Sequence, residues 1–563
     1  MKRITPRTIG MVLLIVVVGL FTVYPLGMIF YGSFRSDAPG MPGHFTMDGY
    51  KEGFTDPTIG KALWNTFSLA TVRTVITMAL AVFFCWIIVR TDTPFRGALE
   101  VLMWINFFIP SLPMAMAWVL LLDPSYGVLN KLLMKLPFID GPLFNCYSFW
   151  GIVWAHIPFS TSVRVLMFAP AFRNMDAALE ESARMSGASN LTTLLRVTFP
   201  ILMPAIVGAT LLGYIRSLES FEIELLLGMP AKFFVFSTKV YDLLRWDPPL
   251  YPPAMALSSI FLVVIVGLIF FNRWVIQRRQ YTTVTGKGYR TTPIRLGKWK
   301  YVTLAFVLVY AGVFLILPVS FLIVGTFMKI SGMFELPDPY TMIHWVEVLG
   351  DPVFSSSLGN SLILCVVAAL AGMTIFSFIS YISVRTKLPG RGVLDFMSWL
   401  PWTVPGLLLA VGLLWVFLEG IPYFKFMYGT MYILIIAMII KELPMGVRVM
   451  DGTMVQINKE LEESARMSGA GWFYTFRRIM APLLIPTYTA TAVMIFLAAM
   501  RDISIVVLLY SPKSRVLSIL MLEHYIGMAP EKGMVVGLII TVICIGTAIT
   551  ARAFGMGLRS ENG

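Results

Sequence analysis

The chain has 563 residues, of which 57% are hydrophobic and 13% are charged, with a formal net charge of +13. Its mean hydropathy is +0.78, and a water-soluble globule could not cover so much apolar surface with so few charges. The composition therefore excludes a soluble protein. The basic residues lie in short segments between apolar runs, a pattern that predicts membrane topology and not nucleic-acid binding.

Twelve apolar segments follow one another along the chain, and most are long enough for the roughly 20 residues that a bilayer core requires. The first six are 9–33, 62–89, 98–122, 147–170, 201–228 and 253–275. The other six are 301–328, 358–384, 393–418, 428–450, 485–510 and 533–555. Because these runs are continuously apolar and do not alternate, they predict helices and not barrel strands. The expected fold is an all-α integral membrane protein with about 12 transmembrane helices.

Lysine and arginine predict the orientation of these helices. Basic residues precede the first segment, and the connection at 272–300 carries basic residues without any acidic one. Both stretches are expected in the cytoplasm, together with the N- and C-termini of this multi-pass chain. The first segment is expected to be a retained helix and not a cleaved signal peptide, since no A-x-A-like site follows it.

A polar decapeptide, LEESARMSGA, occurs twice, at 179–188 and at 461–470. Two prolines follow each copy at the same distance: Pro200 and Pro204 in the first, Pro482 and Pro486 in the second. The segments 89–110 and 384–405 also match, as do Asn65-Thr66-Phe67 and Asn360-Ser361-Leu362. These matches indicate an internal repeat that extends well beyond the decapeptide.

The repeat predicts a division into a first half at 1–271, a basic cytoplasmic linker at 272–300 and a second half at 301–563. Each half holds six of the predicted helices. Because an even number of helices separates the halves, both keep the same orientation. They are expected to be related by a pseudo-two-fold axis along the membrane normal.

The two decapeptides lie in the predicted cytoplasmic connections between the fourth and fifth helices of each half, which we call loop 1 (174–200) and loop 2 (456–482). Asp176 and Asn458 are expected to cap a first helix, and Gly187 and Gly469 to end it. A second short helix is then expected to run to the first of the following prolines. Two near-identical rigid knobs predict two identical partner surfaces below the membrane, and hence a homodimeric partner.

The pattern Glu-Glu-Ser-Ala-(x)₃-Gly, followed by a stretch that ends in proline, resembles the EAA loop of the permease subunits of ATP-binding-cassette (ABC) importers. The usual pattern there is Glu-Ala-Ala-(x)₃-Gly-(x)₉-Ile-x-Leu-Pro. Ser182 and Ser464 stand where the first alanine is usual, and the closing motif reads Ile-Leu-Met-Pro in loop 1 and Leu-Leu-Ile-Pro in loop 2. Two such halves in one chain resemble the ferric-iron class of permeases, whose relatives include fused thiamine and phosphonate importers.

The resemblance implies a non-enzymatic, pore-forming permease subunit in a bacterial inner (plasma) membrane. Its expected partners are two copies of a cytoplasmic ABC ATPase and a periplasmic or lipid-anchored substrate-binding protein, besides membrane lipid. ATP and Mg would be held by the ATPase subunits, because this chain has no GxxxxGK[ST] loop; Gly286-Lys287 lacks the other residues of that motif. No cofactor of its own, no catalytic residue and no nucleic-acid partner is expected.

Ferric iron is the preferred solute, while thiamine, a phosphonate and other small solutes remain alternatives. An ion-gradient-driven secondary transporter is the alternative class. Such a carrier would also suit a six-plus-six repeat, but it would need neither a partner ATPase nor paired knobs. An ion channel or membrane enzyme is not supported, because the chain has neither a selectivity-filter sequence nor a catalytic constellation.

The residues expected to couple the chain to its ATPases lie in the two decapeptides. They are Glu180, Glu181, Ala183, Arg184 and Gly187 in loop 1, and Glu462, Glu463, Ala465, Arg466 and Gly469 in loop 2. The second glutamate and the arginine of each loop are the preferred polar anchors, and the glycines set the shape.

The substrate path is sought among charges inside predicted spans, because such charges are costly. The candidates are Glu219, Glu222, Glu224, Arg501 and Asp502. One interpretation is a structural ion pair between the halves, with Glu219 opposite Arg501. In the other, the four acids line a pore that passes a cation, and oxygen ligands would suit a hard ion such as Fe³⁺.

Cysteine and histidine are scattered singly, without a CxxC or HExxH motif, so neither a metal site nor a disulfide framework is predicted. The four cysteines are expected to be buried thiols that act as small hydrophobes. The 35 methionines show no repeated MxxxM face, which favours helix packing over a copper path.

Overall fold

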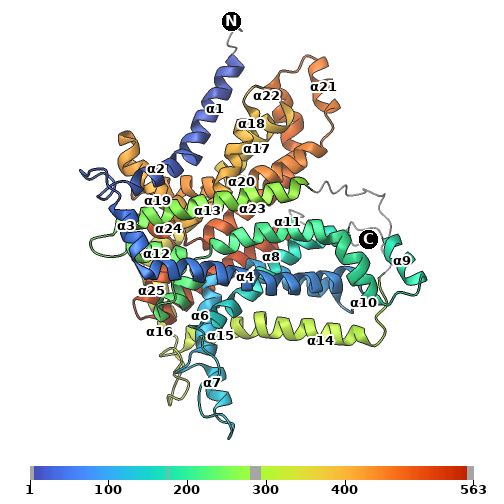
Figure 1. The fold of residues 1–563 in the computed structure, drawn as a ribbon, viewed down its shortest axis with the longest axis vertical. Coiled ribbons are helices and arrows are strands. Elements are labelled where there is room, and N and C mark those ends of the chain that lie inside the picture. Colours follow the sequence, from blue (N-terminus) through green and yellow to red (C-terminus); the bar gives the residue numbers. More distant parts are fainter. Residues whose placement is uncertain (1–5, 174–176, 279–292, 554–563) are drawn as a thin grey trace. The chain divides into compact units, whose positions relative to one another are not determined.

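The computed structural model describes residues 6–173, 177–278 and 293–553 (Figure 1). Within these ranges the chain is helical, and its only β-type pairing consists of isolated bridges. Eight of the described helices are long and apolar enough to cross a membrane, or up to eleven candidate spans if each sharply bent helix pair is one span. The predicted all-α membrane architecture is therefore confirmed.

The chain divides into two compact units, each of which draws on both sequence halves. One unit, which we call unit A, comprises Asp56–Lys239 and Val263–Trp345. Its helices are α4 (Pro57–Cys85), α5 (Arg96–Phe108), α6 (Ser111–Leu122), α7 (Val128–Leu133), α8 (Phe149–Arg173), α9 (Ala177–Met185), α10 (Asn190–Thr193), α11 (Phe199–Leu218), α14 (Trp299–Ala311) and α15 (Leu317–Phe327). The long helices α4, α8 and α11 pack against one another and form its centre (Figure 1).

The other unit, unit B, comprises Met1–Thr55, Val240–Leu262 and Val346–Gly563. Its helices are α1 (Pro6–Thr22), α2 (Tyr24–Ser33), α3 (Asp48–Thr55), α17 (Pro352–Arg385), α18 (Arg391–Trp399), α19 (Gly406–Trp415), α20 (Met431–Gln456), α21 (Glu460–Met467), α22 (Trp472–Thr475), α23 (Ala481–Arg501), α24 (Val506–Leu509), α25 (Leu517–Ile526) and α26 (Pro530–Ala553). Helices α17, α20 and α23 pack together. The boundary between the units falls within α12 (Phe236–Leu244), α13 (Tyr251–Arg278) and α16 (Ile343–Gly350).

Each unit contains the first membrane helix of the opposite sequence half. In unit B, α1 and α2 pack against α18 and α19, and in unit A α15 packs against α6. The contact of α2 with α19 is close because α19 has a glycine there: a Cβ atom on Gly412 would lie 2.6 Å from the carbonyl oxygen of Pro25. The compact units are therefore made of different chain segments from the repeats 1–271 and 301–563. The division of the sequence into these two repeats stays a prediction.

Two predicted spans, 98–122 and 393–418, are not single straight helices. Helices α5 and α6 meet at 97°, and Arg391–Trp402 meets Gly406–Gly420 at 112°. Pro110 and Pro405 stand at the two breaks in extended backbone, with ψ of 145° and 139°. Proline cannot donate to the preceding turn and disfavours helical backbone before it, so each apolar run bends sharply there.

The predicted span 201–228 is wrong at both ends. Its helix starts earlier, because α10 continues through a π-helical turn, Leu194–Thr198, into α11, and it stops at Leu218. In the other unit α22 continues in the same way through Phe476–Met480 into α23. The second helix of each loop is therefore not short. The wide π turns precede Pro200 and Pro482, where a missing N–H interrupts the ordinary hydrogen-bond ladder.

Helix α20 corresponds to the predicted span 428–450. Its 26 residues could cross a bilayer, but it is not among the strongly apolar helices. The reason is its charge, since Lys441, Glu442 and Arg448 all lie within it. Lys441 and Arg448 find acidic partners inside unit B.

The cysteine prediction is confirmed. All four thiols, those of Cys85, Cys146, Cys365 and Cys544, are fully buried and unpaired with one another. Cys146 lies in a connection outside the membrane helices, and burial raises the pKa of its thiol to about 12.

Candidate coupling loops and buried charge networks

Loops 1 and 2 have the same local structure. Each has a short helix, α9 or α21, that ends in a turn whose glycine has a left-handed backbone, with φ of +86° at Gly187 and +82° at Gly469. Beyond each glycine, the amide of Ala188 or Ala470 donates to the carbonyl of Ala183 or Ala465 at 3.0 Å. This six-residue closure is the Schellman motif, and it explains the fixed spacing of alanine and glycine in the decapeptide.

Asp176, the residue predicted to cap the first helix of loop 1, lies outside the described residues. In loop 2 the residue at the cap position of α21 is Lys459, and Asn458, one residue earlier, accepts a hydrogen bond from the backbone amide of Glu460 at 3.2 Å.

The first glutamate of each pair is buried and bound within its own unit. Glu180 is 1% exposed, forms an ion pair with Arg90, and accepts a hydrogen bond from the hydroxyl of Thr198 at 2.5 Å. Arg90 closes the π-helical turn Trp86–Arg90 that continues α4. Glu180 therefore ties loop 1 both to the end of α4 and to the π turn that leads into α11.

Glu462 plays the matching part in loop 2. Its carboxylate lies 3.5 Å from Nε of Arg385, the last residue of α17, and accepts a hydrogen bond from the hydroxyl of Tyr381 at 3.0 Å. A buried apolar cluster lies beneath, formed by Tyr381, Met454, Phe476, Met480 and Leu484. The base of loop 2 is thus fixed to α17, α20 and α23 at once.

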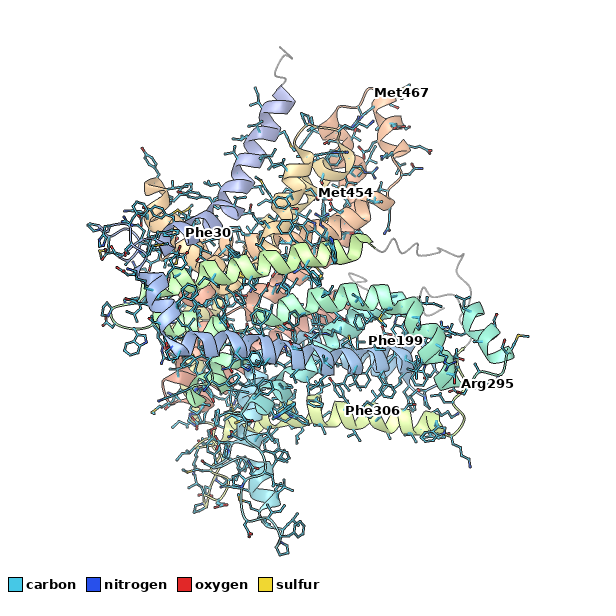
Figure 2. The ribbon with its side chains drawn as sticks, viewed as in Figure 1. Phe30, Phe199, Arg295, Phe306, Met454 and Met467 are labelled. Carbon is cyan, nitrogen blue, oxygen red and sulfur yellow. The ribbon has the colours of Figure 1, made fainter. Side chains whose placement is uncertain are left out.

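The outer faces of the loops carry exposed side chains that a partner could contact. Glu181 and Glu463 are exposed, and Ala183 and Ala465 are partly covered. Met185 and Met467 are 91% and 89% exposed, and Figure 2 shows Met467 at the tip of α21. The Arg466 side chain is 57% exposed and reaches within 3.8 Å of Glu462; of Arg184 only the backbone is described.

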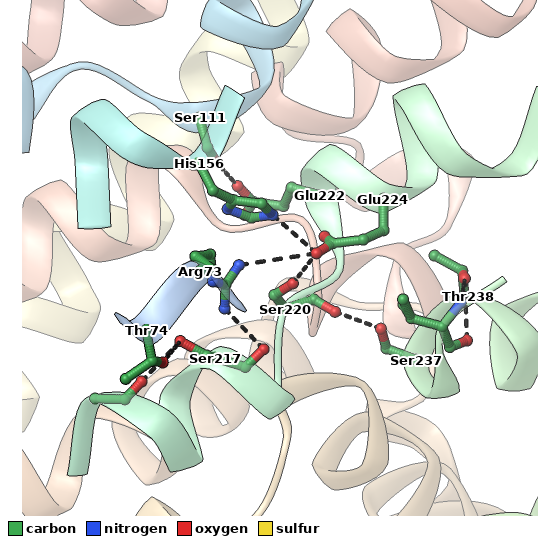
Figure 3. Close-up of polar contacts among 12 residues, drawn as sticks. Arg73, Thr74, Ser111, His156, Ser217, Ser220, Glu222, Glu224, Ser237 and Thr238 are labelled. Atoms are coloured by element: carbon green, nitrogen blue, oxygen red, sulfur yellow. Dashed lines mark hydrogen bonds and ion pairs between the residues drawn. The ribbon is translucent and has the colours of Figure 1, made fainter. Parts of the chain in front are cut away.

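A second group of functional candidates is a buried charge network in unit A (Figure 3). Glu224, with no exposed surface, lies in the π-helical turn Glu224–Gly228 beyond α11. Its Oε1 atom is 2.8 Å from Nε2 of His156 on α8 and 3.8 Å from Nη1 of Arg73 on α4, and it accepts a hydrogen bond from Ser220. Arg73 also donates to the carbonyl of Ser217 at 2.7 Å.

Unit B has a smaller network at the matching place. Asp502, at the end of α23, forms an ion pair with Lys441 of α20. The other oxygen of the same carboxylate accepts the backbone amide of Ile505 at 2.9 Å. In both units a buried acid therefore fixes the segment that follows the fifth helix of the half, but the basic partners differ.

Both halves also hold this segment with the same neutral contacts. Phe236 donates its amide to Oγ1 of Thr66, and Leu517 donates its amide to Oγ of Ser361, each at 2.7 Å. Asn65 and Asn360 each donate a side-chain hydrogen bond to a nearby carbonyl, at 2.9 Å to Phe234 and 2.9 Å to Arg515. The Asn-Thr and Asn-Ser pairs that match in sequence thus make matching contacts.

The five pathway candidates lie in different surroundings. Glu219 caps the end of α11 and pairs with Arg216 at 3.1 Å, and Glu222, partly covered, accepts a hydrogen bond from Ser111. Arg501, the last residue of α23, is partly covered. The prediction placed the acids of the first half inside a membrane span. In the structure they lie just beyond the end of α11, which stops at Leu218.

Arg73, His156 and Lys441, the partners of Glu224 and Asp502, are not among the site residues predicted from the sequence. A signal was present, because an ionisable residue inside an apolar run is a functional or structural candidate by default. In the described residues no group of three or more histidine, cysteine, aspartate or glutamate side chains could hold a metal ion.

Comparison with known proteins gives a consistent result. Residues 373–558 match the family "Binding-protein-dependent transport system inner membrane component". A probable ABC transporter permease, y4fN of Sinorhizobium fredii, is 27% identical over 86% of this chain and 85% of its own length. The ferric transport system permease FbpB of Actinobacillus pleuropneumoniae is 27% identical over 89% of this chain and 72% of its own length.

A shorter relative matches about half of the chain. The spermidine/putrescine transport system permease PotB of Escherichia coli is 27% identical over 45% of this chain and 92% of its own length. A single permease of that length thus corresponds to about one half here. Through this family match and these relatives, the chain is similar to permeases of binding-protein-dependent ABC transport systems, and its length fits two permease halves in one chain.

Proposed function

We propose that this permease forms the translocation path of an importer, and that loops 1 and 2 each dock into one of two identical cytoplasmic ATPase subunits that hold ATP and Mg. The observation that carries the proposal is the matched construction of the two loops. Each presents an exposed methionine and an exposed glutamate on a helix whose base is fixed by a buried glutamate–arginine pair.

The mechanism follows from the way the loops are fixed. A loop gripped by a closing ATPase would move as one piece, since its turn is closed by a Schellman motif. Through Glu180 and Glu462 the movement would reach the ends of α4 and α17. Through the helices that follow the loops it would reach α23 and, across a bend of 63° between Met203 and Ile206, α11. Alternating access would then be a rigid-body change driven at these two points.

The proposed topology has both loops and both chain ends in the cytoplasm of a bacterial cell, with a periplasmic or lipid-anchored binding protein delivering solute at the opposite face. The basic linker supports this orientation. So does the family match, whose description names binding-protein-dependent transport and the inner membrane.

Ferric iron is the solute that we propose, supported by the ferric permease relative that spans most of the chain. Glu219, Glu222, Glu224, Arg501 and Asp502 remain the candidates for the path. Glu219 and Glu222 are the stronger members of this set, because their side chains are only partly covered, whereas Glu224 and Asp502 are buried.

The test is reconstitution of the chain with its ATPase and binding protein in proteoliposomes. We expect two ATPase copies per chain and ATP-dependent uptake of radiolabelled Fe³⁺ that excess thiamine or phosphonate does not reduce. Glu222→Gln should lower uptake at unchanged protein level, with the exposed Glu52→Gln as its matched control. Uptake by the chain alone would contradict the proposal, and uptake of only thiamine or phosphonate would overturn the choice of iron.

A further inference from the structure

The end of the linker, residues 293–298, lies next to the base of loop 1. Residues 279–292 lie outside the described residues, and just beyond them Ile294 forms an isolated parallel bridge with Thr91. The amide of Ile294 donates to the carbonyl of Arg90 at 2.7 Å, and the amide of Asp92 donates to the carbonyl of Ile294 at 3.1 Å. The amide of Leu296 then donates to Oδ1 of Asp92 at 2.9 Å.

This contact is buried and continues into α14. Ile294 and Thr91 are 2% and 0% exposed. Thr93, which hydrogen-bonds Thr91 at 2.7 Å, also hydrogen-bonds Thr303 of α14 at 2.9 Å. Figure 2 shows Arg295 beside the beginning of α14. The linker end and α14 are therefore held to the end of α4 as one buried patch.

Arg90 contacts both the end of the linker and loop 1. The backbone carbonyl of Arg90 accepts the amide of Ile294, while the Arg90 side chain holds Glu180. Only one residue thus separates the linker from the loop. A shift of Glu180 must act on Arg90, and Arg90 is bound to the first helix of the second half through the linker.

Loop 2 has no such attachment among the described residues. Arg385, which matches Arg90, forms an ion pair with Glu462. The backbone carbonyl of the following residue, Thr386, accepts a hydrogen bond at 2.6 Å from the side chain of Arg391, only five residues away. None of the isolated bridges of the described chain involves this segment. The bases of the two loops are consequently built differently, although the loops themselves match.

We infer that the end of the linker, residues 293–298, is a positioning element for loop 1, which couples the movement of α9 to α14 of the second half. The inference rests on the proposed docking of the loops to an ATPase. It assigns to the linker a mechanical role in addition to joining two repeats. It also predicts that the two ATPase contacts are unequal, although the ATPase copies are identical.

The test breaks the bridge and compares the two loops within the same complex. Ile294→Pro removes the amide that Arg90 accepts, while Ile294→Val keeps both the amide and the apolar burial. Met185→Cys and Met467→Cys measure the contact of each loop with the ATPase, because both positions are exposed and the native thiols are buried. In the reconstituted full chain, a bismaleimide joins each of these thiols to a cysteine introduced at the contacting surface of the ATPase.

With Ile294→Pro we expect cross-linking at Met185→Cys to fall, cross-linking at Met467→Cys to stay, and Fe³⁺ transported per ATP to drop by about fivefold or more. Equal cross-linking of both loops, with normal coupling, would overturn the inference. If neither loop cross-links in the chain that keeps Ile294, the result would instead count against the proposed docking itself.

A second pair of variants covers the case in which Ile294→Pro does not accumulate. Asp92→Ala removes the acceptor for the amide of Leu296, whereas Asp92→Asn retains an oxygen there. Asp92→Ala should reproduce the loop 1 defect and Asp92→Asn should rescue it. A loss that is the same in both variants, or that affects both loops equally, would indicate a merely structural role and overturn the inference.

Discussion

Glu180 and Glu462 face inward, and that orientation separates two tasks within the Glu-Glu pair of each loop. The inner carboxylate is held by an arginine and a hydroxyl group from its own unit. The outer carboxylate, Glu181 or Glu463, lies on the exposed side. The sequence pattern favours the outer acids as anchors for a partner. The structure adds that the inner acids anchor the loops to the membrane helices.

Replacing Glu462 by alanine should loosen the base of loop 2. Arg385 would remain buried without its carboxylate, and breaking one side of a buried ion pair costs about 3–5 kcal/mol. We expect a lower thermal unfolding temperature of the purified chain and weaker ATPase binding. Glu463→Ala is the matched control and should leave the unfolding temperature unchanged, so an equal drop in both variants would contradict the division of tasks.

The glycine turn gives a separate prediction. At Gly469, φ is +82° and no atom lies within 4 Å of the place that a Cβ atom would occupy, so a side chain meets backbone strain but no clash. Gly469→Val should cost about 1–2 kcal/mol, distort the turn and lower uptake per ATP. Gly469→Asn should be milder, because asparagine adopts this backbone more readily. Wild-type coupling in Gly469→Val would refute the shaping role of the glycine.

At the scale of elements, the extent of each helix is governed by proline as much as by hydrophobicity. Apolar runs located most membrane helices correctly, and the helix–glycine–helix form of the loops was predictable from local signals. The breaks at Pro110 and Pro405 were not, since a proline in an apolar run is compatible with a mild kink or a sharp bend. Which one occurs depends on the neighbouring helices.

The network around Glu224 was also beyond sequence analysis. Arg73, His156 and Glu224 come from three separate elements, and nothing in the local sequence of one refers to the others. The same holds for the bond between Arg90 and Glu180, whose residues are 90 positions apart. Such partners become apparent only when the packing of α4, α8 and α11 is known.

The packing of α2 on α19 can be tested through Gly412. A Cβ atom there would lie 2.6 Å from a backbone oxygen, which cannot move aside easily. Gly412→Val should therefore destabilise unit B by about 1–3 kcal/mol, as overpacking does, and lower the yield of folded protein. Gly452→Ala in α20, where the Cβ position is open, is the control and should be tolerated. Equal yields would contradict the close packing.

At the scale of the whole molecule, the repeat predicts that loops 1 and 2 lie on the same side of the membrane. Met185→Cys and Met467→Cys should both react with a membrane-impermeant maleimide in inside-out vesicles and not in intact spheroplasts. The unmodified chain is the control: its thiols are buried, and the raised pKa of Cys146, about 12, leaves little reactive thiolate near pH 7. Labelling of the two loops from opposite sides would refute the parallel repeat.

The exchange of first helices has a consequence for biosynthesis. When the ribosome has completed α1 and α2, the helices against which they pack, α18 and α19, still lie in the distant second half of the chain. These two helices must therefore wait beside the insertion machinery, or in lipid, until later translation delivers their neighbours. A truncated nascent chain that ends in the linker would hold these helices without their native contacts, which makes it a natural substrate for membrane quality-control proteases.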